Sequence, residues 1–452
     1  MSFIRYKKIN GKEYAYEVTA YWDPKDKKPK QVNRYLGVVV DKDNGIYKKK
    51  VPEEKMILDF GDTFFLLEYM KSRMPDEYEF MKQFKGLIPL VLYKIVHSGS
   101  MNNARIWAEG NYVSLVYNED LSSQRISEYL QKIGNEKNLR EFFSLHPSKS
   151  AMMMDTTALP NQINIPITEL GYENEISDEE IRLILVLDRK SMRPIFFRYV
   201  SRNIIDVSTL INTIRELKNS GIECDLLILD AGYYSLENLR DFYFMGIDFL
   251  MRLPAKTELY KEMIEIKDLE KKENAVIYGE RVLFIKREKR KIDENDLYVY
   301  VVLDPERRGR EIKRYLKKHL NEADDFSLKR KGYMVLISSY DIAKEDLIPL
   351  YYTRQMIEKA FSYSKTDLSL IPLRVHGEAT LRGYFFVVFL ALDVLISLHS
   401  ELKDRPVNEV LDLLRNLKCK VYDKEIVVQG LTKDQKEIFE RFNIIMPKTM
   451  GI

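Results

Sequence analysis

Cysteine and histidine are scarce in this sequence of 452 residues, which contains two cysteines and five histidines. Cys224 and Cys419 have neither a metal-type spacing nor a pattern of disulfide partners, and His97, His319 and His376 are scattered along the chain. These absences argue against a disulfide-stabilised scaffold and against a His or Cys metal cluster. A reducing cytosol, and hence a cytoplasmic protein, is expected.

Long apolar runs and a signal segment are also missing. Residues 2–16 are polar and charged, which argues against a signal peptide. The most apolar run, residues 384–398, is too short to span a membrane and contains Asp393. We therefore expect a buried core helix there, and no membrane partner.

A strong excess of charge of one sign is absent too, because 72 basic residues face 69 acidic ones and the net charge is +3. Bulk charge therefore does not indicate a nucleic-acid binder, and any such surface must come from local clustering. The hydrophobic fraction of 45% and the charged fraction of 31% are typical of a soluble globular protein. The length allows two or three domains.

The N-terminal third divides into two segments with different predicted secondary structure. Residues 1–52 are predicted to be a β-rich arm, with strands at 14–22 and 31–38. Residues 53–148 are predicted to be helical, with helices at 62–71, 78–96 and 122–134. The last of these could be the second helix of a DNA-reading helix-turn-helix or part of a plain helical bundle.

From residue 149 the pattern changes to an α/β order. Strands are predicted at 151–157, 182–188 and 195–200, then a helix at 207–219, a fourth strand at 225–230, a helix at 235–245 and a strand at 247–252. Three antiparallel strands, a helix and a parallel strand are the order of a ribonuclease-H-like (retroviral-integrase-like) domain, which we expect over residues 149–400. Asp155 ends the first strand and Asp230 the fourth, and these strands are neighbours in that fold. Either aspartate alone would be a turn or cap residue.

Residues 350–365 are predicted to form one helix, with Pro349 in its first turn. Tyr351, Arg354, Glu358 and Lys365 would then share one stripe about 60° wide. A solvated face with an Arg354–Glu358 ion pair explains that stripe without any function.

The spacing Tyr-x2-Arg-x3-Glu-x6-Lys in this helix resembles the signature of the IS-four-type DDE transposases of bacterial and archaeal insertion sequences. Residues 230–233 resemble that family's Asp-Arg-Gly-Tyr/Phe, with Ala231 in place of Arg, and residues 203–206 resemble its Gly-Asn-x-x-Asp without the Gly. Tyr384 replaces a family histidine. The resemblance covers about residues 150–400.

This resemblance implies cleavage of transposon ends to a 3′-hydroxyl and strand transfer into target DNA. Two Mg²⁺ ions, with Mn²⁺ as a possible substitute, would be held by three carboxylates, since these ions prefer oxygen ligands. We assign the bridging position to Asp155 and one metal each to Asp230 and Glu358. Tyr351, Arg354 and Lys365 would bind the neighbouring phosphates.

The implied partners are the terminal inverted repeats and target DNA, with a homodimer or larger synaptic complex that is nucleoid-associated when bound to DNA. Three alternatives remain open at this point. The chain could be a catalytically inactive DNA-binding descendant of a transposase, or a ribonuclease-H-like nuclease that cuts without joining. It could also be a structural protein with an ion-paired helix.

Residues 255–335 exceed what a bare ribonuclease-H fold needs and are predicted to be a mainly β insertion, with strands at 275–287 and 297–303 and a helix at 311–320. Its basic residues are expected to contact DNA phosphates, although solvated loop charge is the alternative. The candidates are Lys286, Arg287, Lys289, Arg290, Arg307 and Arg308. The arm at 1–52 would contact transposon-end DNA or be a plain surface hairpin. The C-terminal region, 401–452, has predicted helices at 407–417 and 433–442 and a strand at 425–428.

Overall fold

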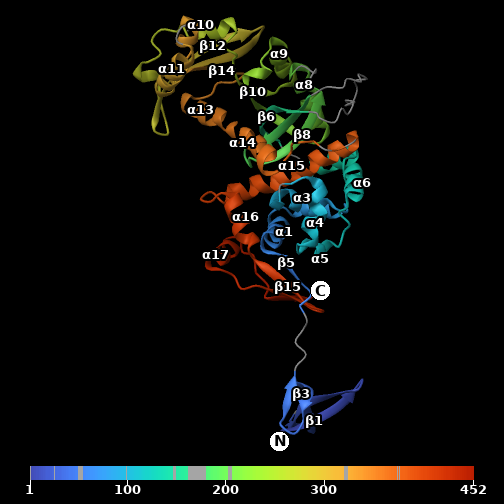
Figure 1. Cartoon of the computed structure of the whole chain (residues 1–452). Coiled ribbons are helices and arrows are strands. Elements are labelled where there is room, and N and C mark those ends of the chain that lie inside the picture. Colours follow the sequence, from blue (N-terminus) through green and yellow to red (C-terminus); the bar gives the residue numbers. More distant parts are fainter. Residues whose placement is uncertain are drawn as a thin grey trace. The chain divides into compact units, whose positions relative to one another are not determined.

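The computed structural model describes residues 2–24, 26–48, 54–97, 99–145, 149–160, 180–201, 206–319, 324–373, 375 and 377–451 (Figure 1). The chain forms two compact units. One comprises Met1–Leu58, Lys418–Gly430 and Met446–Ile452, and the other Asp59–Leu417 and Leu431–Ile445. Residues 203–205 of the expected Gly-Asn-x-x-Asp-like motif lie outside the described residues.

The first unit contains two small antiparallel sheets. The predicted β-arm is confirmed as a meander of β1 (Ser2–Ile9), β2 (Lys12–Asp23), β3 (Lys28–Asp41) and β4 (Ile46–Lys48). Tyr14 and Tyr16 lie two residues apart on one face of β2, and both rings contact Tyr35 of β3 at centroid distances of 6.3 and 5.4 Å. The second sheet has the order β17-β16-β15-β5, from Thr449–Gly451, Glu425–Val428, Lys418–Val421 and Met56–Asp59.

The second unit begins with seven helices. They are α1 (Gly61–Arg73), α2 (Pro75–Lys82), α3 (Leu87–His97), α4 (Ala104–Glu109), α5 (Val113–Tyr117), α6 (Ser123–Ile133) and α7 (Glu136–Phe143). The prediction of one helix over 78–96 is wrong, because the chain turns between α2 and α3. Gly86 has φ +77° there, a left-handed conformation that ends a helical run, and its N–H donates to Glu119 Oε2.

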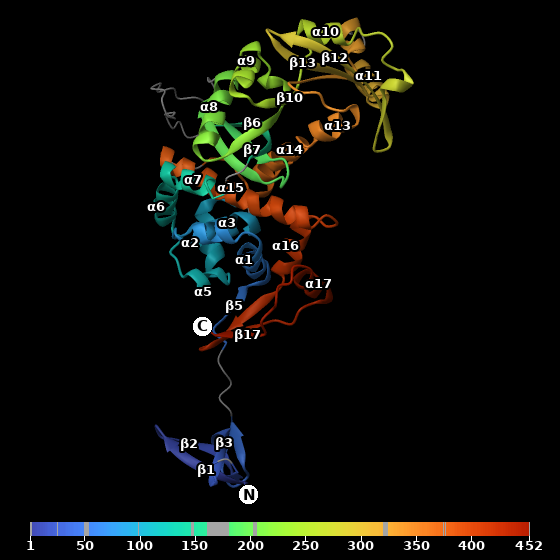
Figure 2. The same cartoon turned by 180° about the vertical axis from the view of Figure 1, so that it is seen from behind.

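Helix α15 (Glu378–Glu401) is the central element of this unit and confirms the predicted core helix. It lies between the N-terminal helices and the large sheet in both views (Figures 1 and 2). Its composition and length would allow a membrane span, but 89% of its most apolar window is buried inside the protein. Its apolar side chains therefore serve as core for the helices on one side and the sheet on the other.

Two glycines allow α15 to approach α6 closely. A Cβ atom at Gly383 would lie 2.0 Å from the Leu130 carbonyl oxygen, and one at Gly134 would lie 1.9 Å from the Ala379 carbonyl oxygen. Both obstacles are backbone atoms, so no side-chain rotation can relieve them. The helices therefore touch backbone to backbone at this crossing.

We expect Gly383→Ala to lower the free energy of unfolding by about 1–3 kcal/mol, because the new methyl group forces the two helices apart. The midpoint of urea unfolding measures the effect. Gly309→Ala in α11 (Pro305–His319) is the matched control, since no atom lies within 4 Å of the new Cβ there. Alanine favours helix over glycine, so the control should be neutral or stabilising. Equal destabilisation by both variants would contradict the tight crossing.

The large sheet has nine strands in the order β11-β12-β13-β14-β10-β9-β6-β7-β8. One half contains β6 (Lys149–Pro160), β7 (Glu180–Asp188), β8 (Pro194–Ser201), β9 (Glu223–Leu229) and β10 (Asp248–Arg252), with α8 (Asp206–Asn219) before β9 and α9 (Leu236–Met245) after it. β6, β7 and β8 are antiparallel, and β9 pairs with β6 in parallel, as predicted. The apolar runs of β6, β7, β9 and β10 are buried on both faces, typical of central strands, and β8 forms the edge of the sheet.

The predicted insertion continues the same sheet. It contains α10 (Glu258–Met263), β11 (Ala275–Tyr278), β12 (Arg281–Ile292), β13 (Asn295–Leu303), α11 and α12 (Asp325–Lys329), and β14 (Tyr333–Ser338) pairs antiparallel with β10. The strand predicted at 275–287 is instead a hairpin, because Gly279 turns with φ +59°. The helix predicted at 311–320 begins earlier, at Pro305, a residue that suits a first helical turn.

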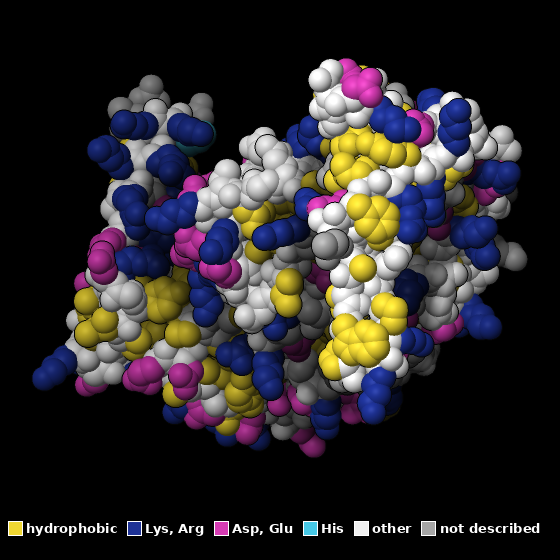
Figure 3. Space-filling model, turned by 90° about the horizontal axis from the view of Figure 1, so that it is seen from below, with side chains coloured by type: hydrophobic (Ala, Val, Ile, Leu, Met, Phe, Trp, Pro, Cys, Tyr) yellow, Lys and Arg dark blue, Asp and Glu magenta, His cyan; other side chains and the backbone are white. Residues whose placement is uncertain are grey.

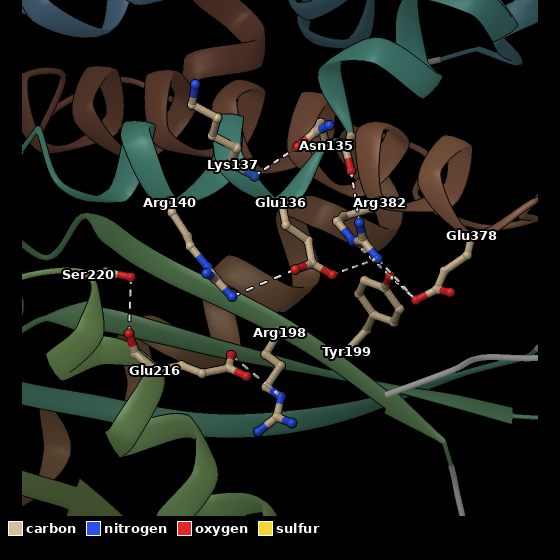
Figure 4. Close-up of polar contacts among 11 residues, drawn as sticks. Asn135, Glu136, Lys137, Arg140, Arg198, Tyr199, Glu216, Ser220, Glu378 and Arg382 are labelled. Carbon is tan, nitrogen blue, oxygen red and sulfur yellow. Dashed lines mark hydrogen bonds and ion pairs between the residues drawn. The ribbon is translucent and has the colours of Figure 1, made fainter. Parts of the chain in front are cut away.

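The sheet edge at β8 is tied to the helices by an ionic network around Arg382 of α15 (Figure 4). Its guanidinium binds the Glu378 carboxylate at 3.1 Å, the Tyr199 hydroxyl at 3.2 Å and the Gly134 carbonyl at 3.1 Å. Glu136 of α7 lies 3.5 Å away. One side chain thus joins α6, α7, α15 and β8, which fixes the sheet against the helical layer.

Candidate active site

The pairing of β6 with β9 places Asp155 and Asp230 beside each other. The last residues paired in this parallel ladder are Met153 and Ile228, and two residues further along each strand are the two aspartates. Side chains two residues apart point to the same face of a sheet. Asp230 follows the end of β9 as predicted, whereas Asp155 lies inside β6, which continues to Pro160, so its prediction as a strand end is wrong.

The helix predicted over residues 350–365 is broken into three pieces. α13 (Lys344–Tyr352) ends before α14 (Gln355–Ser362), and residues Tyr363–Asp367 form a π-helical turn. Pro349 lies inside α13 and not in a first turn. The Thr353 hydroxyl donates to the Leu350 carbonyl at 2.7 Å and competes with the helical hydrogen bonds at the break. The break leaves Arg354 at the start of α14.

Arg354 brings the three predicted carboxylates together. Its Nη2 atom lies 2.8 Å from Asp155 Oδ2 and 3.3 Å from Asp230 Oδ2, and its Nη1 atom lies 2.9 Å from Glu358 Oε1. The two aspartate oxygens can therefore be no further apart than the sum of the first two distances. Strand β6, the end of β9 and helix α14 each contribute one carboxylate to one guanidinium.

Burial and the charges of neighbouring side chains shift the pKa values of Asp155 and Arg354 in opposite directions. Burial raises the pKa of Asp155, while the Arg354 charge and the Thr156 N–H lower it and the Asp230 charge raises it. Burial lowers the pKa of Arg354, but the carboxylates of Asp155, Asp230 and Glu358 raise it, and the net shift is upward. Glu358 is 57% exposed and Arg354 only 12%, so the guanidinium lies beneath a carboxylate that solvent reaches.

Carboxylate oxygens are ligands that Mg²⁺ prefers, so the donor set suits that ion. In the described part of the chain, no three His, Cys, Asp or Glu side chains lie close enough together to hold a metal ion. At Asp155, Asp230 and Glu358, the Arg354 guanidinium contacts all three carboxylates and supplies the positive charge. The site is thus a cation site in which the protein's own arginine is the cation.

The remaining members of the predicted stripe are separated from the carboxylates. Lys365 lies on the π-helical turn and donates to Thr157 Oγ1 at 2.6 Å, two residues beyond Asp155 on the same face of β6. Tyr351 is only 4% exposed, and burial together with the Asp230 charge raises its pKa. Lys365 can reach solvent along β6, whereas Tyr351 packs beneath the site.

The basic residues predicted to bind DNA largely have acidic partners in the described chain. Arg287 pairs with Asp341, Lys289 with Asp296, Arg290 with Glu262 and Glu288, Arg307 with Glu311, and Arg308 with Glu270, while Lys286 donates to the Lys267 carbonyl. On the face drawn in Figure 3, basic and acidic side chains are interspersed over most of the surface, whereas basic side chains gather on the lobe at the upper left. Their DNA contact stays a prediction.

Sequence reasoning missed Arg252 as a site residue. It ends β10, and the β9–β10 register pairs Leu229 with Met251, so Arg252 lies next to Asp230 across the sheet. The signal that could have found it is its position, since it ends the strand that follows Asp230 in the chain. Neighbouring parallel strands are about 4.8 Å apart, so this positive charge borders the carboxylates.

Residues 173–394 match a family model described as the transposase DDE domain. This range contains Asp230, Arg354 and Glu358 and begins after Asp155. Among solved structures, the chain is similar to a piggyBac transposase synaptic complex with hairpin DNA, with 11% identity, a TM-score of 0.39, and coverage of 72% of this chain and 68% of that one. No curated protein sequence matches the chain. The family match supports a DDE transposase.

Proposed function

We propose that this chain is a DDE transposase of the IS-four type, with a ribonuclease-H-like catalytic domain that cleaves transposon ends and transfers the 3′-hydroxyl strands into target DNA. One observation carries the proposal. Three carboxylates from separate elements, Asp155, Asp230 and Glu358, converge on the Arg354 guanidinium. A solvated ion pair within one helix explains only the contact between Arg354 and Glu358, and leaves both aspartates unexplained.

The same carboxylates would hold two Mg²⁺ ions, with Asp155 shared and Asp230 and Glu358 completing one ion each. Such ions, when bound, supply activation of the attacking oxygen and stabilisation of the leaving oxygen at a phosphodiester. Arg354 would have to withdraw from the carboxylates to admit them. A released guanidinium can bind a phosphate with two parallel hydrogen bonds, and Lys365 can act as a point charge beside it.

The partners in this proposal are the terminal inverted repeats and target DNA. Transposition requires two ends to be brought together, so a homodimer or larger synaptic complex is expected. The second candidate is a catalytically inactive DNA-binding descendant. It is favoured by the ion pairs that Arg354 makes with the carboxylates, since a site permanently closed by its own arginine would bind DNA without cutting it.

The test of this function is cleavage of a labelled DNA fragment that carries the inverted repeats flanking the gene for this chain, with Mg²⁺ or Mn²⁺ present. The parent should cut at the repeat boundary, and Glu358→Gln should reduce the rate at least about 10²-fold, because it removes a metal-binding charge and keeps the side-chain shape. Denaturing gels measure the products.

Glu345→Gln, an exposed residue of α13, is the matched control and should cut like the parent. Products joined to a target fragment distinguish a transposase from a nuclease that only cuts. Repeat binding without cleavage by any variant would favour the inactive descendant. Cleavage by Glu358→Gln at the parent rate would remove Glu358 from the site.

A further inference from the structure

A basic hollow of about 460 Å³ lies between helix α11 and the ends of β10 and β14. We call it the α11 hollow. Six cationic side chains line it, namely Arg252, Arg307, Arg314, Lys318, Arg330 and Lys331, against one carboxylate, Glu311. Its volume is within the range of sites that take small molecules, and its lining is far more basic than the chain as a whole, which is nearly balanced.

The charges of the α11 hollow are not neutralised by the protein in the described part of the chain. Glu311 is already engaged, because it lies 3.3 Å from Arg307 Nε and accepts from the Gly332 N–H at 2.9 Å. No described carboxylate lies within 4.0 Å of the other five cations. The cations on β12 differ in this respect, since Lys289 and Arg290 lie 2.8 and 2.5 Å from acidic partners.

Unpaired like charges repel one another, and a bound polyanion offsets that repulsion.

Aromatic side chains add apolar surface to the wall of the α11 hollow. Lys331 Nζ lies 4.4 Å from the centre of the Tyr315 ring, and Tyr260 is buried in the floor. Burial raises the pKa of Tyr260, and the charges of Arg252, Arg330 and Arg307 act against that rise, which is consistent with guanidinium groups gathered around its hydroxyl. Basic grooves with aromatic walls are typical of single-strand nucleic-acid sites.

Arg252 connects the hollow to the candidate active site. It lines the hollow, and the register of β10 with β9 places it beside Asp230. Neighbouring strands are about 4.8 Å apart, which is less than the length of one nucleotide unit in an extended strand. A DNA strand held at the carboxylates therefore needs little further length to enter the hollow.

We propose that the α11 hollow binds one unpaired DNA strand as it leaves the catalytic carboxylates, with Arg252, Arg314, Lys318, Arg330 and Lys331 on its phosphates. This inference rests on the proposed function for the direction of the strand. The binding itself requires neither metal nor cleavage, so it can be tested separately. The recognised chemistry is a phosphodiester chain, not a free phosphate ion.

The experiment measures binding of a fluorescent oligothymidylate by anisotropy, without metal, as a function of salt concentration, in the Glu358→Gln protein. Arg314→Gln combined with Lys318→Gln should weaken binding and reduce the slope of log K against log salt by about 1.4, since each phosphate contact on a single strand contributes about 0.7. The matched control, Lys313→Gln with Lys317→Gln, changes the same helix outside the hollow and should alter the slope by less than half as much.

Equal changes in the two double variants would overturn the hollow as a defined site, because the effect would then be one of overall charge. An unchanged slope in the Arg314 and Lys318 variant would overturn it as well. Displacement of the oligonucleotide by millimolar inorganic phosphate in the parent would indicate a free-anion site and contradict the strand. Absence of cleavage by the parent in the repeat assay would refute the proposed function and leave this binding result standing.

Discussion

Asp155→Asn is expected to reduce metal-dependent cleavage of the repeat fragment by at least about 10³-fold, the largest loss of activity that we predict. Asp155 is the most buried of the three carboxylates and contacts Arg354 from the middle of a core strand. An amide keeps the shape and removes the charge that would be shared between two metals. The rate of strand cleavage on denaturing gels measures the loss.

DNA binding should respond in the opposite direction. Arg354 loses one of its carboxylate partners in Asp155→Asn, so more of its positive charge is available to a phosphate, and binding should be retained or tightened. Asp225→Asn is the matched control, since Asp225 is an exposed residue at the other end of the same strand pair, 3.5 Å from Lys149. The control should cleave and bind like the parent. Cleavage by Asp155→Asn at the parent rate would contradict the assignment of Asp155 as a metal-binding carboxylate.

Arg193→Met is expected to lower the free energy of unfolding by about 3–5 kcal/mol, the largest loss of stability that we predict. Arg193 lies in the turn between β7 and β8 and binds Asp393 of α15 with Nε at 2.8 Å and Nη2 at 2.6 Å. Its Nη2 also contacts Glu77 of α2. Asp393 and Glu77 are 3% and 2% exposed, so removal of the arginine takes its positive charge away from two buried carboxylates.

The positive charge of Arg193 is stabilised by the Asp393 and Glu77 carboxylates. Burial alone lowers its pKa, but the Asp393 and Glu77 carboxylates raise it, and the net shift is upward. In Arg193→Met the buried carboxylates of Asp393 and Glu77 no longer face the arginine charge and protonation lowers their cost, so the stability loss relative to the parent should shrink as the pH falls towards ordinary carboxylate pKa values. The midpoint of urea unfolding at several pH values measures this trend.

Arg193, Asp393 and Glu77 form a buried triad, and Arg240→Met is the matched control for it. Arg240 pairs with Asp293 on the surface, with side chains 58% and 53% exposed, and its loss should change stability little. Arg193→Met combined with Glu77→Gln and Asp393→Asn should recover part of the loss, because the two buried negative charges are then removed together with the cation. If Arg193→Met and Arg240→Met destabilised the protein equally, the buried triad would not tie α2 and α15 to the sheet.

In the structure, Arg354 pairs with the carboxylates of Asp155, Asp230 and Glu358, which we propose to be catalytic. A metal-binding site of three carboxylates is electrostatically costly without a cation, and a buried guanidinium offsets that cost. If these carboxylates hold metal ions as we propose, metal entry would exchange one cation for others and would free the arginine for the DNA phosphates. The Asp155→Asn binding measurement reports directly on this exchange.

Much of the half of the sheet that contains β6, β7, β8 and β9 was predictable from the sequence. The order of strands at 151–157, 182–188, 195–200 and 225–230, with one helix before the last, corresponds to β6, β7, β8 and β9 as the structure has them. Strand order and polar residues near strand ends are local patterns, and the period of two fixes which side chains share a face. The proximity of Asp155 to Asp230 required in addition that β6 and β9 be neighbours, which the expected fold implied and the strand pairing shows.

The break between α13 and α14 was not predictable by helical periodicity. Residues 350–365 contain no glycine or proline, and a regular helix would have placed Arg354, Glu358 and Lys365 on one stripe. The backbone around Thr353 and Arg354 keeps helical dihedral angles but forms tighter i→i+3 hydrogen bonds, the Thr353 hydroxyl bonds the Leu350 carbonyl, and Tyr363–Asp367 form a wider π-helical turn. Lys365 therefore reaches Thr157 on β6, while Arg354 reaches the carboxylates.

The sequence by itself determined the apolar patterns and the order of the strands along the chain, because each depends on residues that are neighbours in the chain, and the resemblance of its motifs pointed to the three carboxylates. Only the tertiary structure decided which charges are paired. Arg193 pairs with Glu77, which is 116 residues away in the chain, and with Asp393, which is 200 residues away. The cations that line the α11 hollow come from separate segments of the chain. On β12, by contrast, Lys289 and Arg290 pair with acidic side chains. Pairing depends on distances below about 4 Å, and folding sets these between residues that are far apart in the chain.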